Sequence, residues 1–270
     1  MTVSGIDEQL VPGSGVQINL RAIGDPEKPP LLLIHGIYDE WSSWNLVYDD
    51  FAAEYRVYAV DLRGHGKSDK PERGYEPTDY AADIASVIRS LGLSDIPVIG
   101  HSLGAVTTGY LAADYPALVK AVVLEDPPGR FDSNTGSRIT PMLEIKRGTE
   151  EETYTFFKEI GPNLGEARWR DQTRRLRNTA DGPFEVIIEW AERGYSPDIV
   201  GTMGRVQCPA LLMQSDPEAG GVLPDDLAGE IVAKLPNGEH QKFHGVGHNI
   251  HKDAPSEFAR SAMEFLHKHR

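Results

Sequence analysis

Apolar and polar positions follow two different rhythms along the 270-residue chain. Residues 15–23 alternate between apolar and polar side chains, which predicts a half-buried antiparallel strand. Residues 6–12 are expected to pair with it as a hairpin. Residues 31–34 and 57–60 are apolar throughout, a pattern typical of strands that are covered on both faces. The first part of the chain therefore predicts an antiparallel edge that leads into a buried parallel sheet.

A helical rhythm separates these strands. Residues 44–55 are expected to form a helix, and apolar side chains recur at helical spacing over residues 78–91, where Gly92 is a stop signal. Further strands are predicted over residues 96–99 and 119–125. Strands that alternate with helices in this way predict an α/β fold with a doubly wound, mostly parallel sheet.

The alternation stops at residue 127 and resumes at residue 208. The interrupted stretch contains helical runs and no strand pattern; the runs cover residues 142–147, 151–160, 167–178 and 184–193. After it come a strand, a helix, a strand and a final helix, over residues 209–213, 225–235, 239–244 and 254–267. We therefore expect an α/β core of residues 1–126 and 208–270. Residues 127–207 should form an inserted helical cap over the carboxyl ends of the strands, where open α/β sheets bind ligands.

The composition of the chain limits which kinds of binding partner and which cellular compartment are expected. The net charge of −14 argues against nucleic acid or an anionic membrane as a partner. Cys208 is the single cysteine, so an internal disulfide is excluded and a reducing compartment is favoured. The N-terminus lacks the features of a signal peptide, and no apolar run approaches membrane-spanning length. A cytoplasmic protein is the expectation, and the oligomeric state stays open.

The candidate chemistry centres on residues 100–104, which read Gly-His-Ser-Leu-Gly between a predicted strand and a small-residue helix. A serine on a sharp turn from strand to helix is the arrangement of an exposed nucleophile. The flanking glycines leave room where the two elements pass closely. Ser102 would also lie at a helix N-terminus, where unpaired N–H groups favour a developing oxyanion. The alternative is a serine helix cap with packing glycines.

Four motifs occur in a characteristic order: His35-Gly36, residues 61–68 (Asp-Leu-Arg-Gly-His-Gly-Lys-Ser), residues 100–104 and residues 245–248 (Gly-Val-Gly-His). In these motifs the sequence resembles the α/β-hydrolase fold family, close to its capped esterase, lactonase and haloperoxidase-like branches. The resemblance covers nearly all of the chain outside the cap. It implies a serine nucleophile, Ser102, an acid and a histidine base, His248, in that order. Dehalogenases and epoxide hydrolases of this family use an aspartate nucleophile, so Ser102 disfavours those activities.

The resemblance also implies where the acid should lie. Related enzymes carry Gly-x-x-Asp or Gly-x-x-Glu after the strand that follows the cap, and here Ser215 replaces the glycine, so that Glu218 takes the acid position. Asp216 stays open as an alternative, as does Glu125, which ends the preceding strand; Asp225 is a further candidate. Any of these carboxylates could hold the tautomer of the histidine and stabilise the imidazolium.

The family position that follows His35-Gly36 is Ile37, and the resemblance implies that its backbone N–H forms the oxyanion hole with that of Leu103. His35 itself is expected to tie this loop down by hydrogen bonds. Neither a metal nor a cofactor is expected. A metal site formed by the histidines of residues 240–251 would need a helix to converge, and Gly245 and Gly247 forbid one.

Residues 168–177 carry a cluster of arginines on a predicted cap helix. Trp169, Thr173 and Leu176 define the inner face of this helix, so most of the arginines should lie on a solvated outer face. The alternative is an arginine that reaches into the pocket toward an acidic substrate.

The sequence thus predicts serine-based acyl transfer to water on a small or medium ester or lactone. Two other functions stay open: a cofactor-free perhydrolase or haloperoxidase-like activity of the same triad, and a hydrolase-like ligand receptor with little turnover. Substrate specificity is expected to lie in large side chains of the cap. The candidates are Phe156, Phe157, Trp169, Phe184 and Trp190.

Overall fold

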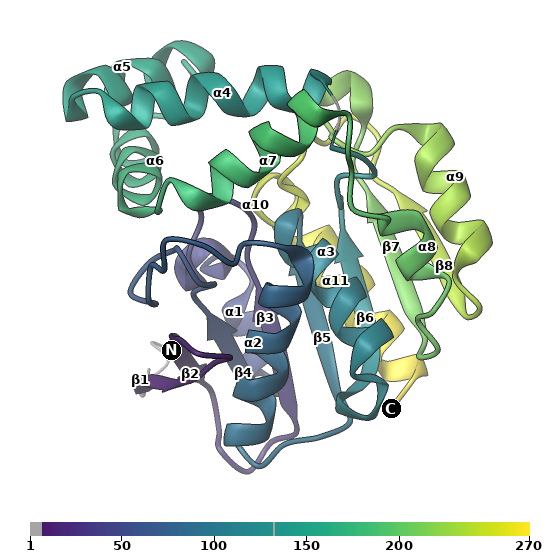
Figure 1. Cartoon of the computed structure of the whole chain (residues 1–270). Coiled ribbons are helices and arrows are strands. Elements are labelled where there is room, and N and C mark those ends of the chain that lie inside the picture. The colour runs from purple at the N-terminus through teal and green to yellow at the C-terminus, as the bar shows by residue number, and fades with distance from the viewer. Residues whose placement is uncertain (1–6, 132) are drawn as a thin grey trace.

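The computed structural model describes residues 7–131 and 133–270. Eight strands form one sheet in the order β1-β2-β4-β3-β5-β6-β7-β8. The β1–β2 and β2–β4 pairs are antiparallel, and the pairs from β4 to β8 are parallel. The strands are β1 Asp7–Pro12, β2 Gln17–Ile23, β3 Pro30–Ile34, β4 Arg56–Val60, β5 Ile96–His101, β6 Val119–Glu125, β7 Ala210–Gln214 and β8 Gly238–Lys242. The predicted doubly wound, mostly parallel sheet is confirmed (Figure 1).

The N-terminal hairpin forms as expected, with Val11 opposite Ile18, while residue 6 lies outside the described residues. Neighbouring side chains of the central strands point to opposite faces of the sheet. Leu32 and Ile34 of β3 pack into the hydrophobic core on one face, and Leu31 and Leu33 pack into the core on the other. This is why the central strands are apolar throughout.

Helices cover both faces of the sheet. One face carries α2 Pro77–Ser90, α3 Leu103–Asp114 and α9 Asp225–Lys234, and the other carries α1 Tyr48–Ala52 and α11 Pro255–Lys268. The short helix α10, Ile250–Asp253, precedes α11, and the 3-10 turns η2, Pro116–Leu118, and η3, Pro217–Ala219, precede β6 and follow β7.

The predicted helix over residues 44–55 is wrong in its extent. The backbone forms a 3-10 turn, η1 Trp41–Trp44, and then the single-turn helix α1. Trp44, Val47 and Phe51 are fully buried, and their three- and four-residue spacing imitates the apolar face of one helix. A turn at residues 45–47 brings these side chains to the core without a continuous helix.

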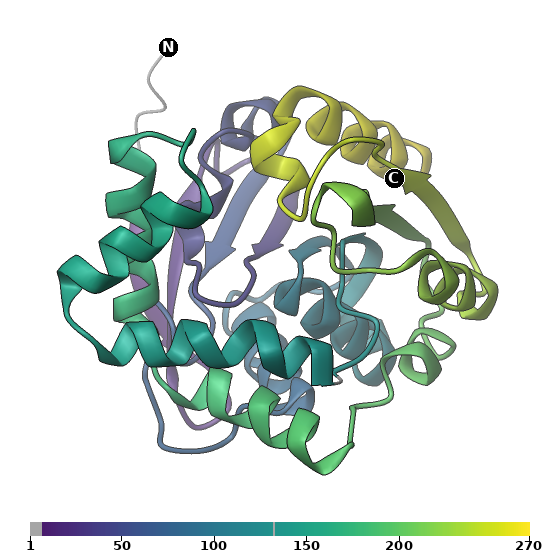
Figure 2. The ribbon, with the colours of Figure 1, turned by 90° about the horizontal axis from the view of Figure 1, so that it is seen from above.

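Between β6 and β7 the described residues form helices and loops, without a strand. The helices are α4 Ser133–Arg147, α5 Glu150–Ile160, α6 Glu166–Asn178, α7 Gly182–Arg193 and α8 Ile199–Met203. Helices α4–α7, which we call the cap, lie above the carboxyl ends of the strands (Figures 1 and 2). Phe157 and Phe184 are fully buried in a small core that belongs to the cap itself. Helix α8 instead packs against α3 and α9, where Met203 is buried.

Candidate active site

The candidate nucleophile, Ser102, lies between β5 and α3, where the parallel sheet presents its carboxyl edge. Its φ of +54° falls in the left-handed region that residues with a β-carbon rarely adopt. Hydrogen bonds hold this turn on both sides: the N–H of Ser102 donates to the carbonyl of Glu125 at 2.8 Å, and its own carbonyl accepts from Ala105 at 2.9 Å. Such strain is typical of a nucleophile elbow, which lifts a serine above the sheet.

The two glycines of the motif are required by space. A β-carbon on Gly104 would lie 2.1 Å from the carbonyl oxygen of Ile34, and one on Gly100 would lie 2.2 Å from the carbonyl oxygen of Gly104. Both obstacles are backbone atoms of tightly packed elements, so neither can move aside. The expectation that these glycines let the strand and the helix pass closely is therefore confirmed.

The carboxylate that meets His248 is Asp126, the first residue after β6. Its Oδ2 lies 2.7 Å from Nδ1 of His248, and its side chain is fully buried. The backbone N–H groups of Ser215 and Val222 also donate to Asp126, at 3.1 and 2.9 Å. A carboxylate accepts hydrogen bonds, so a neutral His248 carries its proton on Nδ1 and keeps a lone pair at Nε2. This is the tautomer that a general base for a serine requires.

The acid expected from the sequence, Glu218, lies elsewhere. It is exposed in η3, and its backbone N–H donates to Asp216 at 3.1 Å. Asp216 in turn accepts from the N–H of Gly245 at 2.8 Å, and Asp225 bonds to the side chains of Gln214 and Lys242. The prediction that Glu218 orients His248 is corrected to Asp126. The reason is that the loop after β7 supports Asp126 through the amide of Ser215 and does not itself supply the acid.

The third candidate acid, Glu125, is adjacent to Asp126 but serves another histidine. Its Oε1 lies 2.8 Å from Nδ1 of His251 and accepts the backbone N–H of His251 at 2.9 Å. Burial raises the pKa of Glu125 to about 7. Consecutive side chains at the end of a strand point to opposite sides, which separates the two carboxylates. A signal for Asp126 was present in the sequence, because two adjacent acids close the strand that precedes the cap.

A buried hydrogen-bond chain runs from Glu125 to Asp39. Burial raises the pKa of Asp39, but the charges of Lys252 and Arg175 outweigh this and hold it well below its usual range. The ionised Asp39 therefore accepts the hydroxyl proton of Ser43, across 2.7 Å. Since this hydroxyl has a single proton, Ser43 must accept from the group on its other side.

That group is Nε2 of His251, 3.0 Å from the hydroxyl of Ser43. A neutral His251 with its proton on Nε2 has a lone pair on Nδ1, which faces Glu125. Burial lowers the pKa of His251 well below its usual value. The chain is therefore fully satisfied when Glu125 holds a proton and donates it to His251.

His101, Glu125 and His251 form the group of described residues whose ligand atoms could surround a metal ion, all within 4.8 Å of one another. Hydrogen bonds already engage most of these atoms. Nε2 of His101 donates to the carbonyl of His248 at 3.0 Å, and both ring nitrogens of His251 have partners. We interpret the group as a structural network beneath the loop that carries His248.

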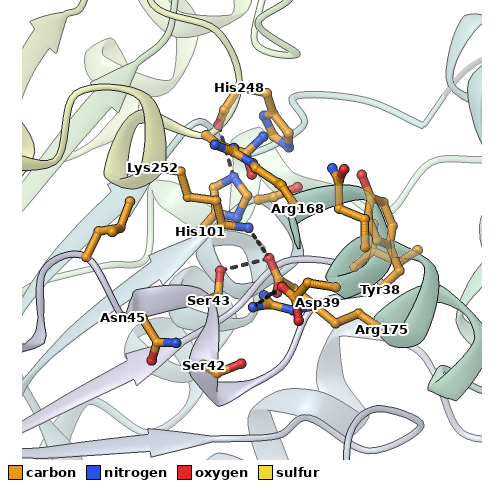
Figure 3. Close-up of a pocket in the computed structure, with 16 residues that line it drawn as sticks. Tyr38, Asp39, Ser42, Ser43, Asn45, His101, Arg168, Arg175, His248 and Lys252 are labelled. Carbon is orange, nitrogen blue, oxygen red and sulfur yellow. Dashed lines mark hydrogen bonds and ion pairs between the residues drawn. The ribbon is translucent and has the colours of Figure 1, made fainter. Parts of the chain in front are cut away.

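Two cavities open at Ser102 and His248. A polar cavity of about 190 Å³ extends toward α6 and α10, and its charged lining residues are Asp39, Arg168, Asp171, Arg175 and Lys252 (Figure 3). A second cavity, of about 530 Å³, lies beneath α4 and α7; we call it the apolar cavity because most of its lining is apolar, although Arg130, Arg138 and Asp226 also line it. Its apolar lining includes Phe131, Ile139, Met142, Ile187, Val222 and Leu227. Ser102 and His248 line both cavities, so the two cavities meet at this pair of residues.

The residues predicted for the oxyanion hole lie at this junction. Ile37 lines both cavities, and Leu103, the first residue of α3, lines the apolar one. His35 anchors the loop as expected, because its Nε2 accepts from the N–H of Leu62 at 3.0 Å and its Nδ1 donates to the carbonyl of Gly36 at 2.7 Å.

The large aromatic residues of the cap, which were expected to contact substrate, line neither cavity. Phe157 and Phe184 form the interior of the cap with Phe156 and Trp169 against them, while Trp190 packs on Phe131. The cap helices therefore bury the rings of Phe157 and Phe184 against one another rather than against the sheet. Smaller side chains of α4 and α7 face the apolar cavity instead.

Three of the five arginines of α6, Arg170, Arg174 and Arg177, are exposed as expected, while the other two turn inward. Arg168 and Arg175 line the polar cavity, and Arg174 makes a two-pronged ion pair with Glu40. Arg170 remains on the exposed side, paired with Glu166. The predicted inner face is confirmed by the burial of Thr173 and Leu176.

Comparisons with known proteins agree with this geometry. A sequence model described as the alpha/beta hydrolase family matches residues 31–261. The chain is 42% identical over 213 residues to a 2-(acetamidomethylene)succinate hydrolase of Mesorhizobium japonicum, which covers 74% of each chain. It is 33% identical over 303 aligned residues to epoxide hydrolase 1 of Caenorhabditis elegans, with 99% of this chain and 72% of the relative covered. The protein therefore belongs to the alpha/beta hydrolase family.

Solved structures show the same fold. E-2-(acetamidomethylene)succinate hydrolase superposes with a TM-score of 0.78 at 24% identity, over 97% of this chain and 99% of the other. The enol-lactonase of Burkholderia xenovorans LB400 superposes with a TM-score of 0.79 at 17% identity, over 96% and 99%. In residues 7–131 and 133–270 no helix has the length and apolar character needed to cross a membrane.

Proposed function

We propose that the protein is a serine hydrolase that cleaves a carboxylic ester or lactone through an acyl-enzyme, with Ser102 as nucleophile, His248 as base and Asp126 as acid. The observation that carries the proposal is the 2.7 Å hydrogen bond between His248 and the buried Asp126, beside a serine on a nucleophile elbow. Ser102 and His248 line the same cavities, where a substrate carbonyl would lie.

The chemistry follows from these positions. Nε2 of His248 accepts the hydroxyl proton as Oγ of Ser102 attacks the carbonyl carbon. Asp126 stabilises the imidazolium that forms, and the N–H groups of Ile37 and Leu103 stabilise the oxyanion. Collapse of the tetrahedral intermediate breaks the bond to the alcohol oxygen, which takes the proton from His248. Water, activated by the same histidine, then hydrolyses the acyl-enzyme.

The relatives support hydrolysis and leave the bond type to be tested. Their names include an enol-lactonase, a naproxen esterase and a hydrolase of 2-(acetamidomethylene)succinate. The relatives also include epoxide hydrolases. Ser102 occupies the elbow position where epoxide hydrolases of this family carry an aspartate, so the esterase and lactonase branch is the better guide.

The test is a hydrolysis panel of aryl esters with acyl chains of two to eight carbons, lactones of increasing ring size, and matched amides. The wild type is compared with Ser102→Ala, and Ser90→Ala on α2 is the control. At least one ester or lactone should be hydrolysed, and Ser102→Ala should lower that rate by a factor of about 10³ or more. If the panel gave no ester or lactone turnover, or if Ser102→Ala kept full activity, the proposal would be wrong.

A further inference from the structure

The polar cavity beside Ser102 concentrates positive charge in a chain whose net charge is −14. Three cationic side chains line it, against two carboxylates, Asp39 and Asp171. The cations come from two elements: Arg168 and Arg175 from the cap helix α6, and Lys252 from α10. A cationic excess inside a small cavity is a favourable environment for an anion.

Two of the three cations are already neutralised. Asp39 pairs with both Lys252 and Arg175, and Arg175 also lies 2.6 Å from Asp171. Asp39 and Arg175 are nearly buried, with 8% and 10% of their side chains exposed. Figure 3 shows Lys252, Arg175 and Ser43 converging on Asp39. These groups form a fixed wall of the cavity.

Arg168 differs from this wall. Its ion pair is with Asp253, where a single guanidinium nitrogen lies at the long distance of 3.4 Å, and 34% of the side chain is exposed. Figure 3 shows its side chain reaching across the cavity toward His248. A guanidinium has five N–H donors in a planar fork that matches a carboxylate. Because only one nitrogen of the Arg168 guanidinium is in its ion pair, the others can donate to a ligand that lies beside His248.

A second side chain in the cavity points to a ligand. The Oε1 atom of Gln172 is buried and has no hydrogen-bond partner among the described residues. The oxygen and nitrogen ends of an amide exchange on a half-turn of the side chain, so Gln172 can offer either an acceptor or its NH₂ group. A buried amide oxygen or NH₂ group without a hydrogen-bond partner costs free energy, and a bound ligand that supplies the partner removes this cost.

We propose that this polar cavity is a carboxylate subsite, with Arg168 as the specificity-determining residue, and that the substrate is an ester or lactone that carries a free carboxylate near its reacting carbonyl. The proposal rests on the serine hydrolase function proposed above. The volume of about 190 Å³ suits a carboxylate on a short carbon chain. The apolar cavity of about 530 Å³ would take the part of the substrate on the other side of Ser102.

The test compares substrates that differ only in this charge. On the acyl side, p-nitrophenyl hemiglutarate is compared with p-nitrophenyl pentanoate, which has the same chain length. On the alcohol side, the acetate ester of 3-hydroxypropanoate is compared with propyl acetate. Each pair is measured with the wild type, with Arg168→Gln, and with Arg170→Gln as the matched control, because Arg170 lies on the exposed side of the same helix.

In one of the two pairs the wild type should prefer the carboxylated ester by a factor of 10 or more in kcat/KM. Arg168→Gln should lower kcat/KM for that ester 10- to 100-fold and leave its neutral partner within threefold, and Arg170→Gln should leave both unchanged. The pair that responds identifies the side of the ester bond that bears the charge. Equal rates on charged and neutral esters, or equal losses on both in Arg168→Gln, would overturn the subsite and leave the hydrolase function standing.

A binding measurement separates the two proposals. Glutarate, pentanoate and inorganic phosphate are titrated calorimetrically into the wild type and into Arg168→Gln. Glutarate should bind more tightly to the wild type than the other two, and Arg168→Gln should weaken it at least 10-fold. This result would support the subsite even if no ester were hydrolysed. Phosphate binding as tight as that of glutarate, or glutarate binding unchanged in the variant, would contradict a carboxylate subsite.

Discussion

At the scale of single residues, the two adjacent carboxylates at the end of β6 have separate partners. Asp126 holds His248 in the tautomer that a base requires, and Glu125 is hydrogen-bonded to the buried His251. Both side chains are fully buried, yet Asp126 contacts a histidine that lines the two cavities at Ser102, and Glu125 contacts a histidine that is itself fully buried. Substitution of Asp126 should therefore lower kcat, whereas substitution of Glu125 should change the pH dependence of stability.

Asp126→Asn should lower kcat by a factor of about 10³–10⁴, because an amide can hold His248 in the wrong tautomer. Glu218→Gln is the matched control, since this exposed residue lies in the loop that was expected to supply the acid. It should retain at least half of the wild-type kcat on the best substrate of the panel. A large loss of kcat in Glu218→Gln, or nearly full activity in Asp126→Asn, would show that the acid lies in the loop after β7 and is not Asp126.

Glu125→Gln should change the pH dependence of stability. Burial raises the pKa of Glu125 from 4.5 to about 7, so between these values the folded state binds more protons than the unfolded state. The stability contributed by Glu125 is therefore lost as the pH rises through this window. Glutamine imitates the protonated acid at every pH, because its NH₂ group can donate to His251.

The measurement is urea unfolding of the wild type and Glu125→Gln at pH 5, 6, 7 and 8. The free energy of unfolding of the wild type, relative to the variant, should fall by roughly 1–3 kcal/mol from pH 5 to 7 and then level off. Parallel profiles over the whole range would show that Glu125 does not titrate in this window.

At the scale of elements, the strands and the elbow could be predicted from sequence because their signals are local. Continuous apolar runs mark the buried strands, and the glycines at 100 and 104 mark a turn whose crowding is set by nearby backbone. Two adjacent acids after the apolar run of β6 were a signal for Asp126, but the sequence could not select it, because the choice depends on how the loop after β7 folds against β6. Counting from Ser215 to Glu218 carries no information about that contact.

The cap shows the same limit. Its helices were predicted from their periodicity, but their apolar faces could be buried against the sheet or against one another. The structure has the second arrangement for Phe157 and Phe184, which leaves smaller side chains to line the apolar cavity. The arginine-rich helix likewise left open an arginine that reaches into the pocket, but its sequence does not show that Arg168 and Arg175 are the ones that turn inward.

The cavity lining predicts how the cap sets chain-length preference. Met142→Ala on α4 should lower kcat/KM for hexanoyl and octanoyl esters, by an amount equivalent to about 1–3 kcal/mol of transition-state free energy. The kcat/KM for acetyl esters should change much less. Phe157→Ala is the comparison, because it removes a ring from the interior of the cap and lines neither cavity. It should lower stability without changing the ratio of long-chain to acetyl rates. The reverse pattern, with chain-length selectivity lost only in Phe157→Ala, would place the acyl pocket inside the cap.

At the scale of the whole molecule, burial of neutral histidines should make the fold sensitive to acid. Burial lowers the pKa of the four buried histidines, His35, His65, His101 and His251, with that of His65 at about 3, and also that of the partly buried His240. Below pH 6.5 the unfolded chain takes up protons that the folded protein cannot, so stability falls as the pH falls. Each such histidine lowers the free energy of unfolding by about 1.4 kcal/mol for each pH unit below 6.5. The titration of Glu125 acts in the opposite direction.

The free energy of unfolding should therefore decrease from pH 6.5 to pH 5 with a slope greater than that of a single histidine. Equilibrium urea unfolding at half-unit steps of pH measures this slope directly. A free energy that stayed constant or rose over the interval would mean that these histidines are protonated in the folded protein.

The central claim is that Ser102, His248 and Asp126 act together as a catalytic triad, and active-site labelling tests it most directly. A fluorophosphonate should modify the wild type at one mole per mole of protein, and peptide mass spectrometry should place the label on Ser102. The rate of labelling should fall at least 100-fold in His248→Ala and Asp126→Asn and stay within threefold of the wild type in Glu218→Gln. A label on any other residue, or a rate that is unchanged in Asp126→Asn, would contradict the account.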